Sequence, residues 1–227
     1  MDLLVFAHFG EAQAFINDIN TCPAGRPVLI GKSGKHAELW KGRYYLLITG
    51  EGIEYAMLAT VRVLSQYREI SRIINLGVCG QVDITQINPL AIGTAIAIRN
   101  VYRESNLAFA AKSFTLNRYA DLPFLDLIST EKRVNDSQHA QFLAPCAPLV
   151  DRELWGVAFA CKDFSLPCYG IKIISDFPSL ERPSAEKICD TVKSMAIGYS
   201  LQLYQQYANW PSLTATSPAM ASSPLSK

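Results

Sequence analysis

The sequence predicts a single α/β domain in which helices flank a central sheet. Short apolar runs alternate with longer helical patterns from residue 3 to about residue 207, which is typical of a sheet covered by helices. A chain of 227 residues is long enough for one such domain with a substantial core. No linker divides residues 1–210, whereas residues 211–227 are rich in Ser, Pro, Thr and Ala and predict a poorly ordered tail.

Four strands and two helices are predicted in the first half of the chain. Apolar runs predict strands at residues 3–7, 36–40, 43–49 and 72–76, of which 36–40 is expected at a sheet edge. The first helix is predicted over residues 11–19, whose apolar side chains share one helical face. A tight turn at residues 50–52 leads into the second helix, over residues 53–67.

Three more strands and two more helices are predicted in the second half. The strands are expected at residues 93–101, 125–129 and 169–174, and the helices at residues 151–164 and 183–207. Residues 104–123 alternate polar and aromatic side chains without a clear period, which predicts a loop with at most short elements.

Composition and charge favour a small-molecule ligand. Apolar residues make up 49% of the chain and charged residues 18%, a normal balance for a globular protein. The net charge is +1 and basic residues are scattered, so we expect neither a nucleic-acid partner nor a membrane partner. The beginning of the sequence lacks the pattern of a signal peptide, which favours a cytoplasmic location.

The sequence predicts neither a metal site nor an organic cofactor. Six cysteines are widely spaced without a CxxC pair, and the three histidines do not cluster with them. Cys79 lies in an apolar context, where free cysteine acts as a small buried hydrophobe.

Three carboxylates occupy positions that an α/β fold can bring together. Glu11 follows the first strand, Asp176 follows a late strand, and Glu153 lies near the start of a helix. Ligands of open α/β sheets bind beyond the carboxyl ends of the strands, where residues 77–80 also fall. Three carboxylates around one pocket suit a reaction that builds positive charge and needs proton transfers. Each could also have a local role: Glu11 and Glu153 could favour a helix N-terminus, and Asp176 could cap a turn before Pro178.

Five short motifs add a family resemblance. They are Ala7–Ala12, Thr49–Gly52, Asn75–Gly80, Val150–Glu153 and Ile174–Asp176. In this order they resemble the nucleoside phosphorylase and nucleosidase family, and within it the hydrolytic branch of methylthioadenosine/S-adenosylhomocysteine nucleosidases and futalosine hydrolases. The resemblance spans about residues 2–207 and implies a mixed twisted sheet flanked by helices.

The resemblance implies that water cleaves the N-glycosidic bond of a purine or modified nucleoside through an oxocarbenium-like transition state. Asp176 would protonate the base, Glu11 would activate the water, and Glu153 would hold the ribose hydroxyls. The other residues implied in binding the nucleoside are Val78, Gly80, Arg133, Val134, Arg152 and Ser175. Relatives of this type form homodimers, so the resemblance also implies a homodimer.

Several departures from the family pattern leave alternatives open. Phosphorylases place Arg and Ser near the segment that matches residues 77–80, but this chain has Asn75 and Val78 there, which favours water over phosphate. Arg152 replaces a methionine, and Arg133 stands where an aromatic residue is expected. These arginines could stack on the base, bind an anionic 5′ group or point to solvent.

Two other functions therefore remain open on the same fold, a non-catalytic nucleoside-binding protein and a phosphorylase with an unusual phosphate site. His8 lies beside Glu11 and could touch the ligand, but the sequence alone favours a loop histidine without a special role.

Overall fold

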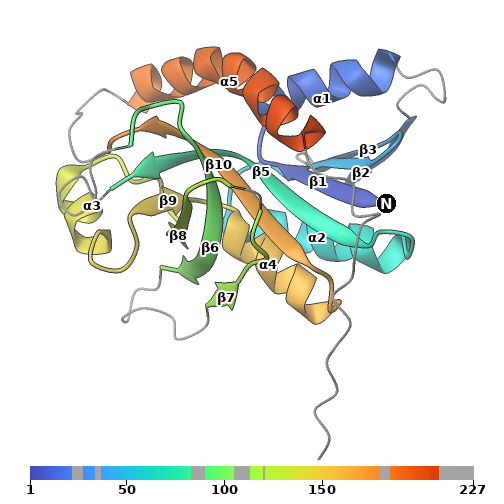
Figure 1. The fold of residues 1–227 in the computed structure, drawn as a ribbon, viewed down its shortest axis with the longest axis horizontal. Coiled ribbons are helices and arrows are strands. Elements are labelled where there is room, and N and C mark those ends of the chain that lie inside the picture. Colours follow the sequence, from blue (N-terminus) through green and yellow to red (C-terminus); the bar gives the residue numbers. More distant parts are fainter. Residues whose placement is uncertain are drawn as a thin grey trace, which may run out of the picture.

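The structure places one sheet between two layers of helices (Figure 1). This computed structural model describes residues 1–21, 28–33, 37–82, 90–104, 113–119, 121–178 and 185–209. The strands are β1 (Asp2–Phe6), β2 (Val28–Ser33), β3 (Ala37–Lys41), β4 (Tyr45–Ile48), β5 (Arg72–Gln81), β6 (Ala95–Arg103), β7 (Phe114–Thr115), β8 (Phe124–Ser129), β9 (Leu149–Asp151) and β10 (Cys168–Asp176). The helices are α1 (Phe9–Thr21), α2 (Ile53–Gln66), α3 (Ser137–Leu143), α4 (Leu154–Asp163) and α5 (Ala185–Ala208). The single-domain α/β architecture with a mixed sheet is therefore confirmed.

Part of the mixed sheet closes on itself. β1 pairs in parallel with β4 and β5, and β5 pairs in parallel with β10. β10 also pairs antiparallel with β6, and pairings through β8 and β9 lead back to β5. Five strands thus form a closed ring, while β1, β4, β3 and β2 extend from it as an open sheet. The sequence did not indicate this ring, because its alternating pattern is the same for an open sheet.

Both faces of the sheet are buried, which explains why the strands are nearly continuous apolar runs. In β1, Leu3 and Val5 join the core beneath α2 and α4, whereas Leu4 and Phe6 join the core beneath α1 and α5. Figure 1 shows α1 and α5 together on one face of the sheet and α2 and α4 on the other.

The helices α2 and α4 approach each other closely at Gly156. A Cβ atom at this position would lie 2.2 Å from the carbonyl oxygen of Ile53, so a larger residue would force the two helices apart. The close packing brings the N-terminus of α4 beside the N-terminus of α2. Glu153 and Gly52, which precede these helices, therefore become neighbours.

Most predicted elements are present, with shifts of a few residues at their ends. Two predictions are wrong. Residues 36–40 do not form an edge strand, because β3 pairs with β4 on one side and with β2 on the other. The helix predicted over residues 151–164 begins only at Leu154, because Asp151 ends strand β9. Strands β2 and β9 and helix α3 were not predicted, and the predicted tail at residues 211–227 lies outside the described residues.

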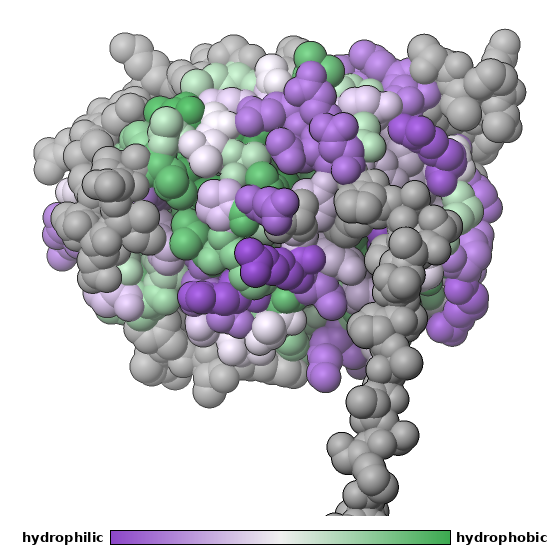
Figure 2. All heavy atoms as spheres, viewed as in Figure 1, coloured by the Kyte–Doolittle hydropathy of each residue, from purple (hydrophilic) through white to green (hydrophobic). Residues whose placement is uncertain are grey.

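The surface in the same view carries both kinds of side chain. Figure 2 shows hydrophobic residues on the left of the face, the side where β8 and β9 lie in Figure 1, and hydrophilic residues mainly towards the right and below. Among the described helices, none combines the length and the apolar character needed to cross a bilayer.

Candidate active site

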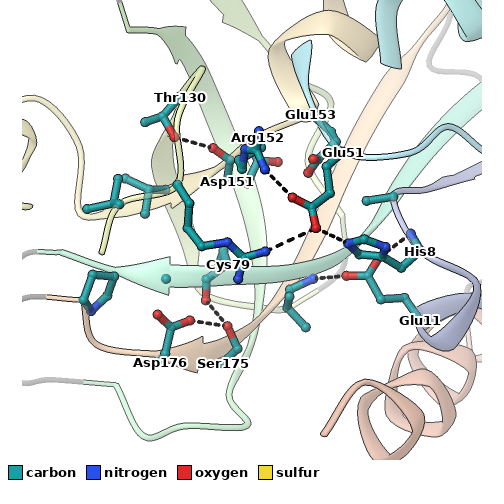
Figure 3. A pocket seen from close by; sticks show the side chains of 17 residues that line it. His8, Glu11, Glu51, Cys79, Thr130, Asp151, Arg152, Glu153, Ser175 and Asp176 are labelled. Carbon is teal, nitrogen blue, oxygen red and sulfur yellow. Dashed lines mark hydrogen bonds and ion pairs between the residues drawn. The ribbon is translucent and has the colours of Figure 1, made fainter. Parts of the chain in front are cut away.

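One pocket lies where β1, β5 and β10 end, and Figure 3 shows the side chains that surround it. Its empty volume is about 670 Å³, part of which is open to solvent. The structure brings every site residue predicted from the sequence to this pocket: Glu11, Val78, Gly80, Arg133, Val134, Arg152, Glu153, Ser175 and Asp176. Residues that are up to 165 positions apart in the chain, such as Glu11 and Asp176, therefore share one cavity.

Two backbone amides hold the carboxylate of Glu11 at the pocket. It lies in the first turn of α1 and is only 3% exposed. Its Oε1 accepts a hydrogen bond of 3.0 Å from the Val78 amide, and its Oε2 accepts one of 3.1 Å from the His8 amide. A Cβ atom on residue 77 would lie 3.0 Å from Oε1, so Gly77 leaves room for this carboxylate. Glu11 is thus held facing the end of β5.

Glu153 reaches across to the neighbouring helix. It occupies the N-cap position of α4, yet its side chain makes no capping bond to that helix. Instead its Oε1 accepts a 3.0 Å hydrogen bond from the amide of Gly52, at the N-terminus of α2. Burial, followed by the nearby charge of Asp151, raises the pKa of Glu153 to about 7, against the opposing effect of Lys172. Its carboxyl group can therefore exchange a proton near neutral pH.

Asp151 and Lys172 form a buried ion pair at the base of the pocket. Lys172 Nζ lies 2.7 Å from Asp151 Oδ2, and Ser129 donates a 2.5 Å hydrogen bond to Oδ1. The Leu154 amide also donates to Oδ2, over 3.1 Å, so Asp151 caps α4 in place of Glu153. Sequence reasoning missed both residues, although a lysine inside the apolar run of β10 is a signal for a buried charge partner.

An irregularity in strand β10 sets the position of Asp176 at the pocket. The pairing of β10 with β5 shifts register between Ile174 and Asp176, which sets Asp176 opposite Gly80. Ser175 Oγ lies 2.5 Å from Asp176 Oδ1 and 3.2 Å from the carbonyl oxygen of Cys79. Burial raises the pKa of Asp176, while the Ser175 hydroxyl and Arg133 act in the opposite direction. The protonated form of Asp176 therefore persists to higher pH than for an exposed aspartate.

A cluster of charged side chains forms another wall of the pocket, and Figure 3 shows two of them, Glu51 and His8, on the side away from Asp176. Glu51 is at its centre: Oε1 lies 2.7 Å from His8 Nε2 and 3.2 Å from Arg133 Nη2, and Oε2 pairs with Arg152 Nη1. The His8 hydrogen bond, with the charges of both arginines, lowers the pKa of Glu51 to about 2. The same hydrogen bond raises the pKa of His8. We call these four residues the charged wall.

Two members of the charged wall were missed or undervalued from the sequence. The sequence predicts only a turn at Glu51, although a glutamate between Gly50 and Gly52 is a signal for a side chain that faces the pocket. His8 lies in the pocket wall and is paired, contrary to the expectation of a loop histidine without a role.

Neither a reactive thiol nor a metal site is found among the described residues of the pocket. Cys79 is buried, and burial raises the pKa of its thiol well above the ordinary value, which disfavours the reactive thiolate. In the stretches that the structure describes, no group of three or more His, Cys, Asp or Glu side chains is arranged to hold a metal ion.

The fold has counterparts among solved structures, although the sequence comparisons find none. No protein-family model matches the sequence, and the comparison with curated proteins also finds no match. Solved structures do match.

The chain is similar to Helicobacter pylori 5′-methylthioadenosine/S-adenosylhomocysteine nucleosidase, with a TM-score of 0.74 and 15% identity over 91% of this chain and 97% of that one. It is also similar to Helicobacter pylori futalosine hydrolase, with a TM-score of 0.73, 15% identity and coverage of 91% and 97%. The Neisseria meningitidis 5′-methylthioadenosine/S-adenosylhomocysteine nucleosidase gives a TM-score of 0.70 and 14% identity, again over 91% and 97%. At this identity the similarity establishes the fold, which is the one that the sequence motifs indicated.

Proposed function

We propose that the protein is a nucleoside N-ribohydrolase, which cleaves the N-glycosidic bond of a purine or modified nucleoside with water. The observation that carries this proposal is the convergence of Glu11, Glu153 and Asp176 on one pocket. The three groups differ in environment: Glu11 is held by two backbone amides, Glu153 is buried, and Asp176 is partly buried beside a serine. Different environments allow carboxyl groups to take different roles. The solved structures named above are nucleosidases and a futalosine hydrolase, which agrees with the proposal.

In the proposed reaction, Asp176 donates its proton to the base as the bond between the base and C1′ breaks. A purine accepts this proton at N7 and leaves as a neutral molecule. The raised pKa of Asp176 supports this role, since a general acid must be protonated when the bond breaks. Ser175 fixes the carboxyl group through its short contact with Oδ1.

The sugar develops positive charge, which the acidic side of the pocket stabilises. Glu153 binds the ribose hydroxyls, and Glu11 accepts a proton from the water whose oxygen forms the new bond to C1′. The products are the free base and the free sugar. Val78, Gly80 and Val134 line the space between these groups and supply its apolar surface.

The test is base release from purine nucleosides, followed by chromatography with and without inorganic phosphate. Phosphate-independent release of base and free sugar supports the hydrolase. Strict dependence on phosphate would replace it with a phosphorylase, and saturable binding without release would replace it with a nucleoside-binding protein. The charged wall is the specific feature that favours this last alternative, because its Arg133 and Arg152 line the pocket where the family resemblance implies an aromatic residue and a methionine.

We further propose that the protein acts in the cytoplasm as a homodimer. Phe9 and Tyr55 are exposed large side chains that line a hollow beside the pocket, a position that a second subunit can cover. Light scattering of the purified protein tests the dimer, since a monomer at micromolar concentration would contradict it.

A further inference from the structure

The charged wall holds more cations than one carboxylate can neutralise. Three basic side chains, His8, Arg133 and Arg152, converge on Glu51 alone. The other pocket carboxylates have different hydrogen-bond or ion-pair partners: backbone amides hold Glu11 and Glu153, Ser175 holds Asp176, and Lys172 pairs with Asp151. The charge of Arg133 also acts through space on one of them, Asp176. This wall therefore presents a surplus of positive charge to the cavity.

Both arginines of the charged wall also have N–H donors without an acceptor among the described residues. A guanidinium group has five N–H donors. Arg152 uses Nη1 for Glu51 and Nη2 for the Glu131 carbonyl, over 3.2 Å, but its buried Nε has no hydrogen-bond partner in the described structure. Arg133 finds an acceptor among the described residues for Nη2 only. An apolar substrate group against this wall would leave such donors desolvated and unpaired, which costs free energy.

The charged wall lies close to the expected position of the 5′ end of the ribose, which is the end farthest from the base. With the base at Asp176 and the ribose hydroxyls at Glu153, the ribose 5′ carbon points away from Asp176, the side on which Figure 3 shows Glu51 and His8. A second hollow of about 930 Å³ continues beyond these residues and shares His8 and Glu51 with the first pocket. There is room for a substituent that extends from the sugar.

We propose, on the basis of the proposed nucleosidase function, that the substrate carries an anionic group on its 5′ side and that Arg152, Arg133 and His8 bind it. The shared chemistry is that of a carboxylate or a phosphate, since both present several acceptor oxygens to a guanidinium fork. The Glu51 carboxylate lies where this anion would contact the arginines. Binding of substrate displaces Glu51 from at least one arginine.

Binding titrations with nucleosides that differ only in their 5′ group test this proposal directly. The panel contains 5′-methylthio, 5′-phosphate, 5′-carboxyalkylthio and 5′-aminoalkylthio nucleosides, each prepared with adenine and with hypoxanthine, and affinities are measured by calorimetry. We expect at least one anionic compound to bind about tenfold or more tightly than its methylthio counterpart, as charge-assisted hydrogen bonds predict. The phosphate and carboxylate arms identify which anion is bound.

Two variants and a control locate the effect. R152M should remove most of the preference for the anion, whereas E51Q, which removes the competing charge, should strengthen anion binding. R99M makes the same replacement outside the pocket, at a residue paired with Asp126 on the sheet, and should leave the preference unchanged.

Equal or tighter binding of the methylthio or aminoalkyl compounds would overturn the proposal, as would a failure of every anionic member to bind. Base release measured on the same panel separates this inference from the proposed function. Cleavage without a preference for the anion would support the nucleosidase activity and refute the anion site. Anion-selective binding without cleavage leaves the inference and removes the hydrolase.

Discussion

Lys172 Nζ lies 2.7 Å from Asp151 Oδ2 at the base of the pocket, and both side chains are almost completely shielded from solvent. The two residues come from β10 and β9, which are separate strands of the closed ring. Their pairing neutralises two charges beside Glu153. The ion pair therefore contributes both to the stability of the fold and to the electrostatics of the site.

Replacing one partner of this pair should therefore be costly. We expect K172M to lower the free energy of unfolding by about 3–5 kcal/mol, because Asp151 is left as an uncompensated buried charge. The double variant D151N/K172M should be less destabilised than the sum of the two single variants, which chemical denaturation can measure. As a control, K41M breaks the half-exposed pair with Glu69 and should be far less destabilising than K172M. A cost as small for K172M would contradict the structural role.

Removing the proposed proton donor, Asp176, should reduce base release while the fold persists. D176N keeps the shape of the side chain but cannot supply a proton, so turnover should fall by about 10²–10⁴-fold. E11Q should cause a similar loss for the attacking water. Steady-state rates and circular dichroism on the same samples separate lost chemistry from lost structure. Unchanged rates in both variants would remove these residues from the mechanism.

The raised pKa of Glu153 predicts a particular dependence of stability on pH. Its folded-state pKa of about 7 exceeds the ordinary value of 4.5, so the folded state binds this proton more tightly than the unfolded state. The resulting stabilisation is complete below pH 4.5 and is lost as pH rises through 7. Relative to E153Q, which cannot titrate, the wild type should lose up to about 3 kcal/mol over this interval. Denaturation of both proteins from pH 4 to 8 measures the difference, and parallel curves would show that Glu153 titrates normally.

The close packing of α4 on α2 can be tested at Gly156. G156A would place a Cβ atom 2.2 Å from the carbonyl oxygen of Ile53, so the helices must separate, at a cost of about 1–3 kcal/mol. The separation also moves Gly52 from Glu153 and should lower activity. G198A is the matched control, because a Cβ atom on this exposed glycine of α5 meets nothing within 4 Å and alanine favours a helix. Thermal melting should show a lower Tm for G156A only.

The sequence was sufficient for those parts of the fold that depend on local patterns. Strands β1, β5 and β10 are buried on both faces, so each is an apolar run that stands out from its surroundings. Strand β9 has only three residues and was merged with the following helix, because its pairing with β5 and β8 lies far away in the chain. Closure of the ring is likewise a property of register between distant strands, which no single segment encodes.

The candidate site divides in the same way. Glu11, Glu153 and Asp176 could be named because each follows or precedes a recognisable element. Glu51 and Lys172 carry only an indirect signal, a glutamate between two glycines and a lysine in an apolar strand, because their partners become neighbours only in the folded chain. Arg133 and Arg152 were recognised as departures, but their common contact with Glu51 required the three-dimensional structure.

The closed ring of strands divides this protein into a fixed and a replaceable part. Asp176 is part of a ring strand, and hydrogen bonds on both sides of β10 hold that strand in place. His8, Glu51 and Arg133, in contrast, lie on the connections after β1, β4 and β8, and can be exchanged without breaking a strand pairing. Evolution or protein engineering can thus change the lining of the pocket by altering these connections alone, while Asp176, the proposed proton donor, stays where the closed ring of strands holds it.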